Sequence, residues 1–250
     1  MSSTIYRITP ISVGTLTIER PQLVWGQGWG TVVQCPVLLY HIEGGGRSIM
    51  VDTGCADPDW ATRYHKPFVR TPEQEPEAAL QSAGVDPAGV DTVLVTHLHW
   101  DHCYNQELFV NARFLVQRAE LQYAAAPHPI FANVYEAPTI GMTPAYSRTR
   151  FEVLDGDHDV ADGITLVFAP GHTPGMQCPL VNTAEGVYYI AGDNVPLYEN
   201  LAGNKCGRPM PGMMYGNLDQ YYQTLRRMER LADHILPGHE MKVLDRSSYG

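Results

Sequence analysis

The sequence predicts an α/β fold in which β-sheets are covered by helices. Short apolar runs of strand length, bounded by turn residues, recur along most of the chain, and segments with helical spacing lie between them. With 250 residues, 44% of them hydrophobic, the chain can bury a substantial core. No internal repeat or low-complexity linker divides it, so we expect one domain over residues 1–250.

The predicted strands are apolar runs that end at Gly, Pro, Asn or Asp. They span residues 31–41, 48–51, 92–96, 113–117, 164–168, 178–182 and 187–191. The predicted helices carry apolar residues at three- and four-residue steps and span residues 75–83, 118–125 and 218–232. Asn217 is placed to cap the first turn of the last helix.

A different composition marks residues 126–150, where four prolines lie among aromatic residues and methionine. Such a segment is too rich in proline for a regular helix or central strand. We interpret it as a loop insertion that forms one wall of a pocket, with an ordered surface excursion as the alternative.

The charge balance disfavours nucleic acid as a partner. The chain has 27 acidic and 17 basic side chains, a net charge of -10, and no run of Lys or Arg. The N-terminus lacks a basic segment followed by an apolar stretch, and nowhere do about 18 apolar residues run together. We expect a soluble, cytoplasmic protein that binds a small-molecule substrate and no membrane; the sequence leaves a homodimer open.

The five cysteines are odd in number, scattered, and form no CxxC pair. This pattern is typical of neither a disulfide framework nor a structural zinc knot. We expect reduced thiols in or near the core for most of Cys35, Cys55, Cys103, Cys178 and Cys206.

A dense group of metal-ligand residues follows the predicted strand at 92–96. His97, His99 and Asp101 alternate, so in an extended chain their side chains share one face. His102 breaks this alternation, and a turn would direct it with Asp101 towards a second metal nearby. Burying such a group without a metal would leave several polar groups competing for partners. The segment therefore predicts a metal site.

Three further candidate ligands stand where apolar runs give way to loops containing Gly or Pro. They are His172 after the run at 164–168, Asp193 after the run at 187–191, and His239 after Ile235 and Leu236. Side chains at the ends of neighbouring strands can meet at one edge of a sheet. The remaining histidines lack this context and are expected to be bystanders: His41, His65, His128, His158 and His234.

The motif His97-x-His99-x-Asp101-His102, followed by Gly171-His172, Gly192-Asp193 and Gly238-His239, resembles the metallo-β-lactamase superfamily. Val51-Asp52-Thr53-Gly54 also matches, so the resemblance covers nearly the whole chain. It implies an αββα sandwich of two β-sheets flanked by helices. Within the superfamily the chain is most similar to the N-acyl homoserine lactonase group, through its length, the strand before Val51 and the absence of extra domains.

The resemblance implies a dinuclear centre. His97, His99 and His172 would hold the first metal, and Asp101, His102 and His239 the second, with Asp193 bridging the two. Asp52 would orient a ligand histidine by hydrogen bonding. Imidazole and carboxylate ligands suit Zn²⁺ best and also admit Fe, Mn or Co.

The same resemblance implies hydrolysis of a small lactone, or of a related ester or amide. A water bridging two cations is acidified and becomes a hydroxide nucleophile, while Asp101 relays a proton. We expect aromatic and methionine side chains to line the pocket. The candidates are Trp25, Trp29, Tyr104, Phe131, Met213, Tyr198 and Tyr215.

Other functions remain as alternatives. A persulfide dioxygenase would use a subset of the same ligands to hold one iron, and a non-catalytic metal-binding protein would need a closed coordination shell. Glyoxalase II needs a helical region after the last ligand, whereas 11 residues follow His239. Acidity disfavours the RNA-processing members, and the true β-lactamases are usually exported.

The sequence departs from the lactonase pattern at two places. Cys103-Tyr104 follows His102, where a small residue and glycine are usual; we expect the Cys103 thiol to pack away from the metals. Pro196 stands three positions after Asp193, where the lactonases typically place a tyrosine that contacts the substrate. Proline offers no donor, so we predict that acyl homoserine lactones are weak substrates unless Tyr198 or Tyr215 replaces the missing hydroxyl.

Overall fold

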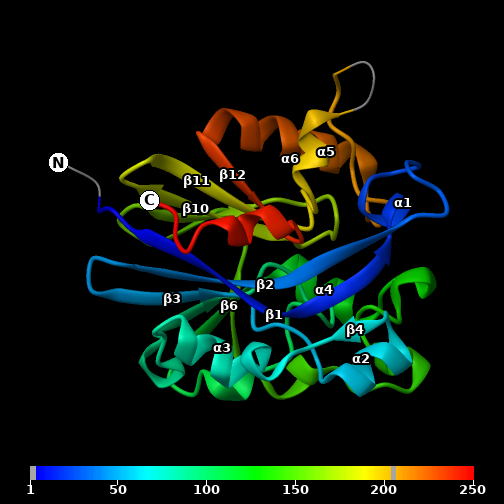
Figure 1. Ribbon diagram of the computed structural model, residues 1–250, viewed down its shortest axis with the longest axis horizontal. Coiled ribbons are helices and arrows are strands. Elements are labelled where there is room, and N and C mark those ends of the chain that lie inside the picture. The colour runs from blue at the N-terminus through cyan, green and yellow to red at the C-terminus, as the bar shows by residue number, and fades with distance from the viewer. Residues whose placement is uncertain (1–3, 204–206) are drawn as a thin grey trace.

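The computed structural model describes residues 4–203 and 207–250 and consists of two β-sheets packed face to face between layers of helices (Figure 1). From the top of that view, the layers are α6, the sheet with β10 to β12, the sheet with β1 to β3, and the helices α2 and α3. The predicted sandwich of two sheets flanked by helices is therefore confirmed.

The larger sheet has seven strands in the order β4-β1-β2-β3-β5-β6-β7. Pairing is antiparallel from β4 to β3 and parallel from β3 to β7, so the sheet is mixed. Its strands are β1 (Arg7–Glu19), β2 (Val32–Gly44), β3 (Arg47–Val51), β4 (Phe68–Val69), β5 (Thr92–Leu94), β6 (Arg113–Gln117) and β7 (Phe151–Leu154).

The smaller sheet has five strands in the order β12-β11-β10-β9-β8. Because β10 is antiparallel to both β9 and β11, and β12 is parallel to β11, the strands β9, β11 and β12 end at the same edge. Its strands are β8 (His158–Ala161), β9 (Ile164–Phe168), β10 (Gln177–Thr183), β11 (Gly186–Gly192) and β12 (His234–Pro237).

Helices cover the outer faces of both sheets. The helices of the described residues are α1 (Arg20–Leu23), α2 (Pro58–Tyr64), α3 (Pro76–Ser82), α4 (Arg118–Ala125), α5 (Tyr198–Ala202) and α6 (Leu218–Leu231), of which α2, α3, α4 and α6 pack on the sheets. Short 3-10 turns occur at Pro72–Gln74, Pro87–Gly89, Gln106–Leu108, Pro129–Phe131, Pro138–Ile140, Ala145–Arg148 and Met241–Asp245. The Asn217 side chain accepts a hydrogen bond from the Gln220 backbone N–H at 3.0 Å, so the predicted helix cap is confirmed.

Three apolar clusters hold these layers together. The central cluster joins the facing sheets through residues such as Ile8 and Leu94 on one side and Val181 and Leu236 on the other. A second packs the outer face of the larger sheet against α2, α3 and α4, and a third packs the smaller sheet against α6. Burial on both faces explains why the middle strands read as nearly continuous apolar runs.

The seven strands and three helices predicted from the sequence are present, with ends that shift by no more than a few residues. The longest omission is β1. Pro10 and Gly14 weaken its strand signal, and the pairing register with β2 shifts between Ser12 and Thr15. Gly14 has a φ of 140°, and a Cβ there would lie 2.1 Å from the Phe68 ring, so this irregularity requires glycine.

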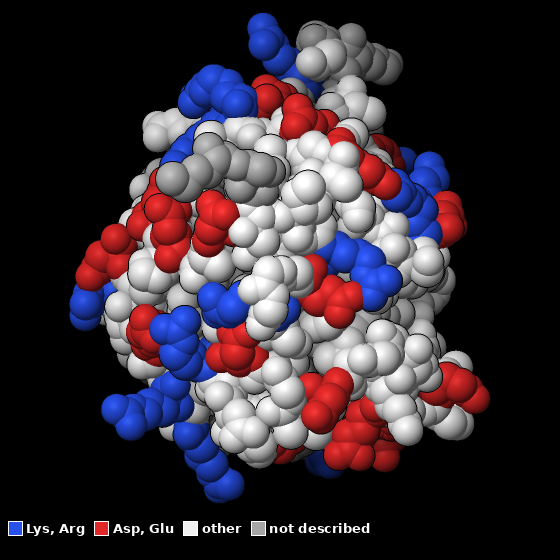
Figure 2. Space-filling model, turned by 90° about the vertical axis from the view of Figure 1, so that its left-hand side faces the viewer, with Lys and Arg blue, Asp and Glu red and all other residues white. Residues whose placement is uncertain are grey.

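No helix in residues 4–203 and 207–250 is long and apolar enough to cross a membrane. On the face seen in Figure 2, acidic and basic side chains are interspersed. Cys35, Cys55, Cys103 and Cys178 are buried free thiols, as expected, whereas Cys206 lies outside the described residues.

Candidate metal centre

The seven predicted ligands converge at one end of the space between the two sheets. The segment from His97 to His102 follows β5 of the larger sheet, while His172, Asp193 and His239 follow β9, β11 and β12 of the smaller one. The shared direction of the last three strands brings their following loops to the same edge. Together these side chains form three overlapping groups, each compact enough to hold a metal ion.

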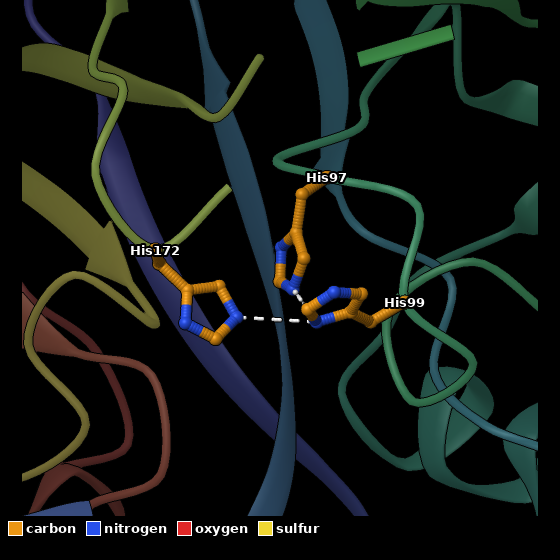
Figure 3. A group of neighbouring side chains, drawn as sticks. All are labelled: His97, His99 and His172. Atoms are coloured by element: carbon orange, nitrogen blue, oxygen red, sulfur yellow. Dashed lines mark hydrogen bonds between the residues drawn. The ribbon is translucent and has the colours of Figure 1, made fainter. Parts of the chain in front are cut away.

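The first group consists of three buried histidines whose ring nitrogens point at one another (Figure 3). His99 Nδ1 lies 3.0 Å from His97 Nε2 and 3.1 Å from His172 Nε2. Nitrogens bound tetrahedrally to one Zn²⁺ would be about 3.3 Å apart, from Zn–N distances of about 2.0–2.1 Å. The apposition of these nitrogens therefore suits a metal ion between them.

The second group consists of Asp101, His102 and His239. The Oδ2 atom of Asp101 lies 3.8 Å from Nε2 of each of the two histidines. Asp193 stands between the groups: its Oδ2 lies 3.4 Å from His172 Nε2, and its Oδ1 lies 3.2 Å from His102 Nε2 and 3.1 Å from His239 Nε2. Each carboxylate oxygen of Asp193 thus faces a different group.

Hydrogen bonds on the far side of the rings fix which nitrogen is free. His172 Nδ1 contacts the Met214 carbonyl at 3.1 Å, and His239 Nδ1 contacts the Pro36 carbonyl at 3.0 Å. A carbonyl only accepts, so Nδ1 carries the proton and a neutral ring presents the Nε2 lone pair to the centre.

Two buried polar atoms at the centre have no hydrogen-bond partner among the described residues: His102 Nε2 and Asp193 Oδ1. They are close to each other but not aligned as a hydrogen bond. Leaving such atoms unpaired in the interior is costly. A cation between them would satisfy both, so the residues present fit a two-metal centre.

Asp52 connects both groups to the backbone. Its Oδ2 lies 2.8 Å from His102 Nδ1 and accepts from the Thr96 hydroxyl at 2.8 Å, while Oδ1 accepts from the Thr96 N–H at 2.7 Å. Thr96 Oγ1 is in turn 3.0 Å from His97 Nδ1. Asp52 has a φ of 60°, a left-handed conformation that aspartate tolerates better than most residues. Its placement fits the orienting role inferred from the sequence.

Glu120, at the start of α4, is fully buried beside the three-histidine group. One carboxylate oxygen accepts from the Leu98 N–H at 3.0 Å and the Tyr135 hydroxyl at 2.8 Å; the other accepts from the Thr173 hydroxyl at 2.6 Å and the Gly175 N–H at 3.1 Å. Leu98 lies between His97 and His99, and Thr173 follows His172. Glu120 therefore ties together the two loops that carry these histidines.

Electrostatics differ between the two groups. Burial lowers the pKa of His97, His99 and His172, and the positive charge that a neighbouring histidine would carry lowers it further for His97 and His99. Burial also opposes protonation of His102 and His239, but Asp193 and Asp101 outweigh it and raise the pKa of both, well above the ordinary value for His102. The three-histidine group is thus prepared as neutral rings, and the second group attracts positive charge.

A small cavity of about 70 Å³ opens onto the centre. His99, Asp101, His172, Asp193 and His239 form its floor. Its other lining residues are Leu16, Ile18, Gln22, Leu23, Lys66, Trp100, Val134, Pro196, Gly212 and Met214. Ligand cavities for drug-sized molecules usually measure about 300–1,000 Å³, so this one suits a compact substrate.

None of the seven predicted pocket residues is among those that line this cavity. Trp29 is 71% exposed, Trp25 packs against Tyr215 with ring centroids 5.6 Å apart, and Tyr104 lines a separate groove. The other three residues also lie elsewhere. Met214 lines the cavity in place of the predicted Met213. Phe131 packs against the core on the outer face of the larger sheet, and Tyr198 packs against the core between the sheets.

The loop at residues 126–150 contributes to the centre at only a few positions. Val134 lines the cavity, and the Tyr135 ring packs edge-on against His99 at 4.6 Å. Residues 143–145 and 147–150 instead line the groove that includes Tyr104. Within the insertion, Val134 thus lines the cavity, residues such as Tyr135 and Ala137 are buried, and short 3-10 turns form much of the remainder.

Neither Cys103 nor any of the five bystander histidines belongs to a potential metal-binding group in residues 4–203 and 207–250. Burial raises the pKa of the Cys103 thiol, and its sulfur accepts a hydrogen bond from the Gln106 side chain at 2.7 Å. The expectation that Cys103 packs away from the metals agrees with this position.

Glu120, Lys66 and Gln22 are among the site residues that sequence reasoning missed. A glutamate in the first turn of a helix is common on protein surfaces, because it suits the positive end of the helix dipole, so nothing distinguished Glu120. Lys66 and Gln22 lie in segments without a motif, and only the fold brings them to the cavity.

Comparison with known proteins agrees with this geometry. A family model described as "Metallo-beta-lactamase superfamily" matches residues 30–239. An N-acyl homoserine lactonase from a Bacillus species is 31% identical over 165 residues, which cover 62% of this chain and 61% of that relative. The N-acyl homoserine lactonase AttM of Azorhizobium caulinodans is 28% identical over an alignment of 269 positions, covering 94% of this chain and 93% of AttM.

Solved structures show the same fold. A quorum-quenching N-acyl homoserine lactone lactonase superposes with a TM-score of 0.76 at 22% identity, covering 97% of this chain and 95% of the other. An N-acyl homoserine lactone hydrolase with N-hexanoyl-L-homoserine bound at its catalytic metal centre superposes with a TM-score of 0.78 at 19% identity, covering 98% and 96%.

Proposed function

The chain belongs to the metallo-β-lactamase superfamily, and from that premise we propose that it is a lactonase-like hydrolase with two divalent metal ions, preferentially Zn²⁺, that opens a small lactone or cleaves a related ester or amide. The observation that carries the proposal is the position of Asp193. Its two oxygens face the two groups of ligands, as a carboxylate that bridges a pair of metal ions must.

Each of the two groups of ligands would hold one metal ion. His97, His99 and His172 would hold one ion, and Asp101, His102 and His239 the other. When bound, such a pair of ions acidifies a water molecule and polarises the substrate carbonyl.

The chain's own residues supply position and proton transfer. The Asp101 side chain is 13% exposed and lines the cavity, so its carboxylate can take a proton at Oδ2 and pass it to the departing oxygen. For a lactone the departing oxygen stays tethered, and the product is a hydroxy acid.

The cavity supports a compact substrate in preference to a long-chain acyl homoserine lactone. Pro196 lines the cavity at the position where the lactonase pattern has a tyrosine, and Tyr198 and Tyr215 are not among its lining residues. Losing one such donor costs about 100- to 1,000-fold in rate when nothing replaces it. A long acyl chain would also have to extend beyond this small cavity.

Metal analysis tests the dinuclear centre. We expect two metal ions per chain after loading with Zn²⁺ or Mn²⁺ and removal of the excess. A single tightly bound ion would overturn the proposal. If that ion were iron and the protein consumed O₂ with a persulfide, the activity would be that of a dioxygenase.

A substrate screen tests the reaction. We expect the loaded protein to release acid from small lactones, and kcat/KM for a chain-length series of acyl homoserine lactones to stay below about 10⁶ M⁻¹ s⁻¹, a value well within the range of dedicated enzymes. A higher value for any member of the series would contradict the substrate preference, and no hydrolysis of any lactone, ester or amide would contradict the proposed function.

A further inference from the structure

Lys66 differs from the other partly buried cations of the protein. Five lysine or arginine side chains among the described residues are partly buried, and four of them pair with a carboxylate. These pairs are Arg20 with Glu199, Arg47 with Asp91, Arg70 with Glu75, and Arg227 with Asp157. Lys66 has no carboxylate within ion-pairing distance among residues 4–203 and 207–250, and it lines the cavity above the metal centre.

The position of the Lys66 ammonium is set by its neighbours. Its backbone N–H donates to the Ala61 carbonyl at 3.0 Å, which closes the turn after α2. Its Nζ donates to Gln22 Oε1 at 2.8 Å, and Gln22 Nε2 in turn donates to Glu19 Oε2 at 3.2 Å. The amide of Gln22 is therefore oriented with its oxygen towards the ammonium.

An ammonium has three N–H donors, and the structure assigns a protein partner to one of them, Gln22. Lysines that serve only to cover apolar surface extend the ammonium into water. Lys66 is half-buried and lines a cavity whose remaining walls, away from the metal ligands, are mainly apolar: Leu16, Ile18, Leu23, Trp100, Val134, Pro196 and Met214. Among the described residues of these mainly apolar walls, the Lys66 ammonium is the one cationic group, so it favours an anionic group on the ligand.

We propose that Lys66, supported by Gln22, is a specificity-determining residue that binds an anionic substituent, a carboxylate, on the substrate. The proposal rests on the proposed hydrolase function and narrows it: the substrate is a compact lactone or ester that bears a carboxylate away from the bond that is cleaved. The metal centre takes the reacting carbonyl, and the Lys66 ammonium takes the carboxylate. Neutral analogues leave the ammonium without an anionic partner and bind more weakly.

The test compares two probes that differ in one group. They are a γ-butyrolactone with a carboxylate on the ring and the same lactone with a carboxamide in its place. The first measurement is the ratio of their kcat/KM values. The second is the ratio of the affinities of their ring-opened products, measured by calorimetry on protein loaded with two metal ions, which does not depend on turnover.

For the unaltered protein, we expect the carboxylate member to be preferred by roughly 10- to 100-fold in both measurements, the range for a hydrogen-bonded charge. Lys66→Met and Lys66→Gln should bring both ratios to within about threefold of one, whereas Lys66→Arg should keep part of the preference. Gln22→Glu should also reduce the ratios, because the new carboxylate would pair with Lys66. The matched control is Lys242→Met, an exposed lysine outside the cavity, which should keep the full preference.

Several outcomes would overturn the proposal. The unaltered protein could show no preference for the carboxylate probe, or the preference could survive in Lys66→Met and Lys66→Gln. These variants could also lose kcat/KM and affinity equally for both probes. Metal content is measured for each variant, so that a loss of ions is not mistaken for a loss of recognition. If neither lactone is hydrolysed but the product preference depends on Lys66, the anion site stands and the hydrolase function fails. If both are hydrolysed equally well without any preference, the function stands and the anion site fails.

Discussion

The two halves of the metal centre are built differently although they share Asp193. In the half with His97, His99 and His172, the outer ring nitrogens of His97 and His172 contact uncharged groups, the Thr96 hydroxyl and the Met214 carbonyl, and burial lowers the pKa of all three histidines. The half with Asp101, His102 and His239 is surrounded by carboxylates, which raise the pKa of its histidines.

This difference indicates how each half receives its metal. Neutral imidazoles in the first half are ready to bind a cation, since a histidine ligand must be deprotonated. In the second half, the neighbouring carboxylates raise the pKa of the histidines, so protons compete more strongly with a cation for these rings. The first half is therefore the site whose occupancy depends less on pH.

Removing the shared carboxylate should have the largest effect. In Asp193→Asn, both halves lose the same negatively charged ligand. Burial opposes ionisation of Asp193, but His239, His102 and His172 outweigh it and hold the pKa of this carboxyl well below its usual range. We expect the metal content to fall below two ions per chain and lactone hydrolysis to drop by more than about 100-fold, beyond the range for groups that only orient a ligand. Retention of both ions with full activity would show that Asp193 does not bridge the halves.

A smaller effect, confined to the first half, is expected for Glu120→Gln. The side-chain amide would present N–H groups to donors that now meet a carboxylate oxygen, so the loops of His97, His99 and His172 would loosen. We expect about a 10- to 100-fold weaker metal affinity in that half and a changed visible spectrum of the Co²⁺-loaded protein.

The matched control is Glu77→Gln, an exposed glutamate on α3. It should leave both the affinity and the spectrum unchanged. If Glu120→Gln instead lowered the metal affinity of both halves equally, Glu120 would stabilise the fold as a whole.

Acidification should have the next largest effect, because the two halves should lose their metal ions at different pH values. Because the pKa values of His102 and His239 are raised, protons compete with the metal ion for these two rings at a higher pH than for the other three histidines. Metal affinity in that half should then fall by about tenfold per pH unit for each proton taken up. The pKa values of the other three histidines are lowered, so their ion should remain until the pH is more acidic. Metal content after dialysis at a series of pH values measures this. Loss of both ions at a single midpoint would contradict the comparison.

The smallest effect is expected for Cys103→Ala, next to His102 in the chain. The thiol is buried and receives a hydrogen bond from Gln106, so the change should cost about 1 kcal/mol of unfolding free energy and leave two ions bound. His234→Ala, on the exposed start of β12, should change neither property. Loss of an ion from Cys103→Ala would assign the thiol to the second half of the centre.

Much of the fold could be predicted because its signals are local. Strand β6 and helix α4 have the predicted limits, since apolar runs and helical spacing are visible within a few residues. Strand β1 was not predicted, because Gly14, which is needed for close packing against Phe68, weakens the apolar strand pattern. That requirement arises only when the strands are assembled.

The same distinction applies to the centre. The amino-acid sequence by itself determined the ligand set, because His97, His99, Asp101 and His102 lie within six residues and the others follow strands whose ends are recognisable. The walls above them were decided by the tertiary structure. Gln22, Lys66, Val134 and Pro196 are far apart in the sequence and meet only because the two sheets bring their loops to one edge. Cavity walls depend on long-range packing, which leaves no periodic pattern in any one segment.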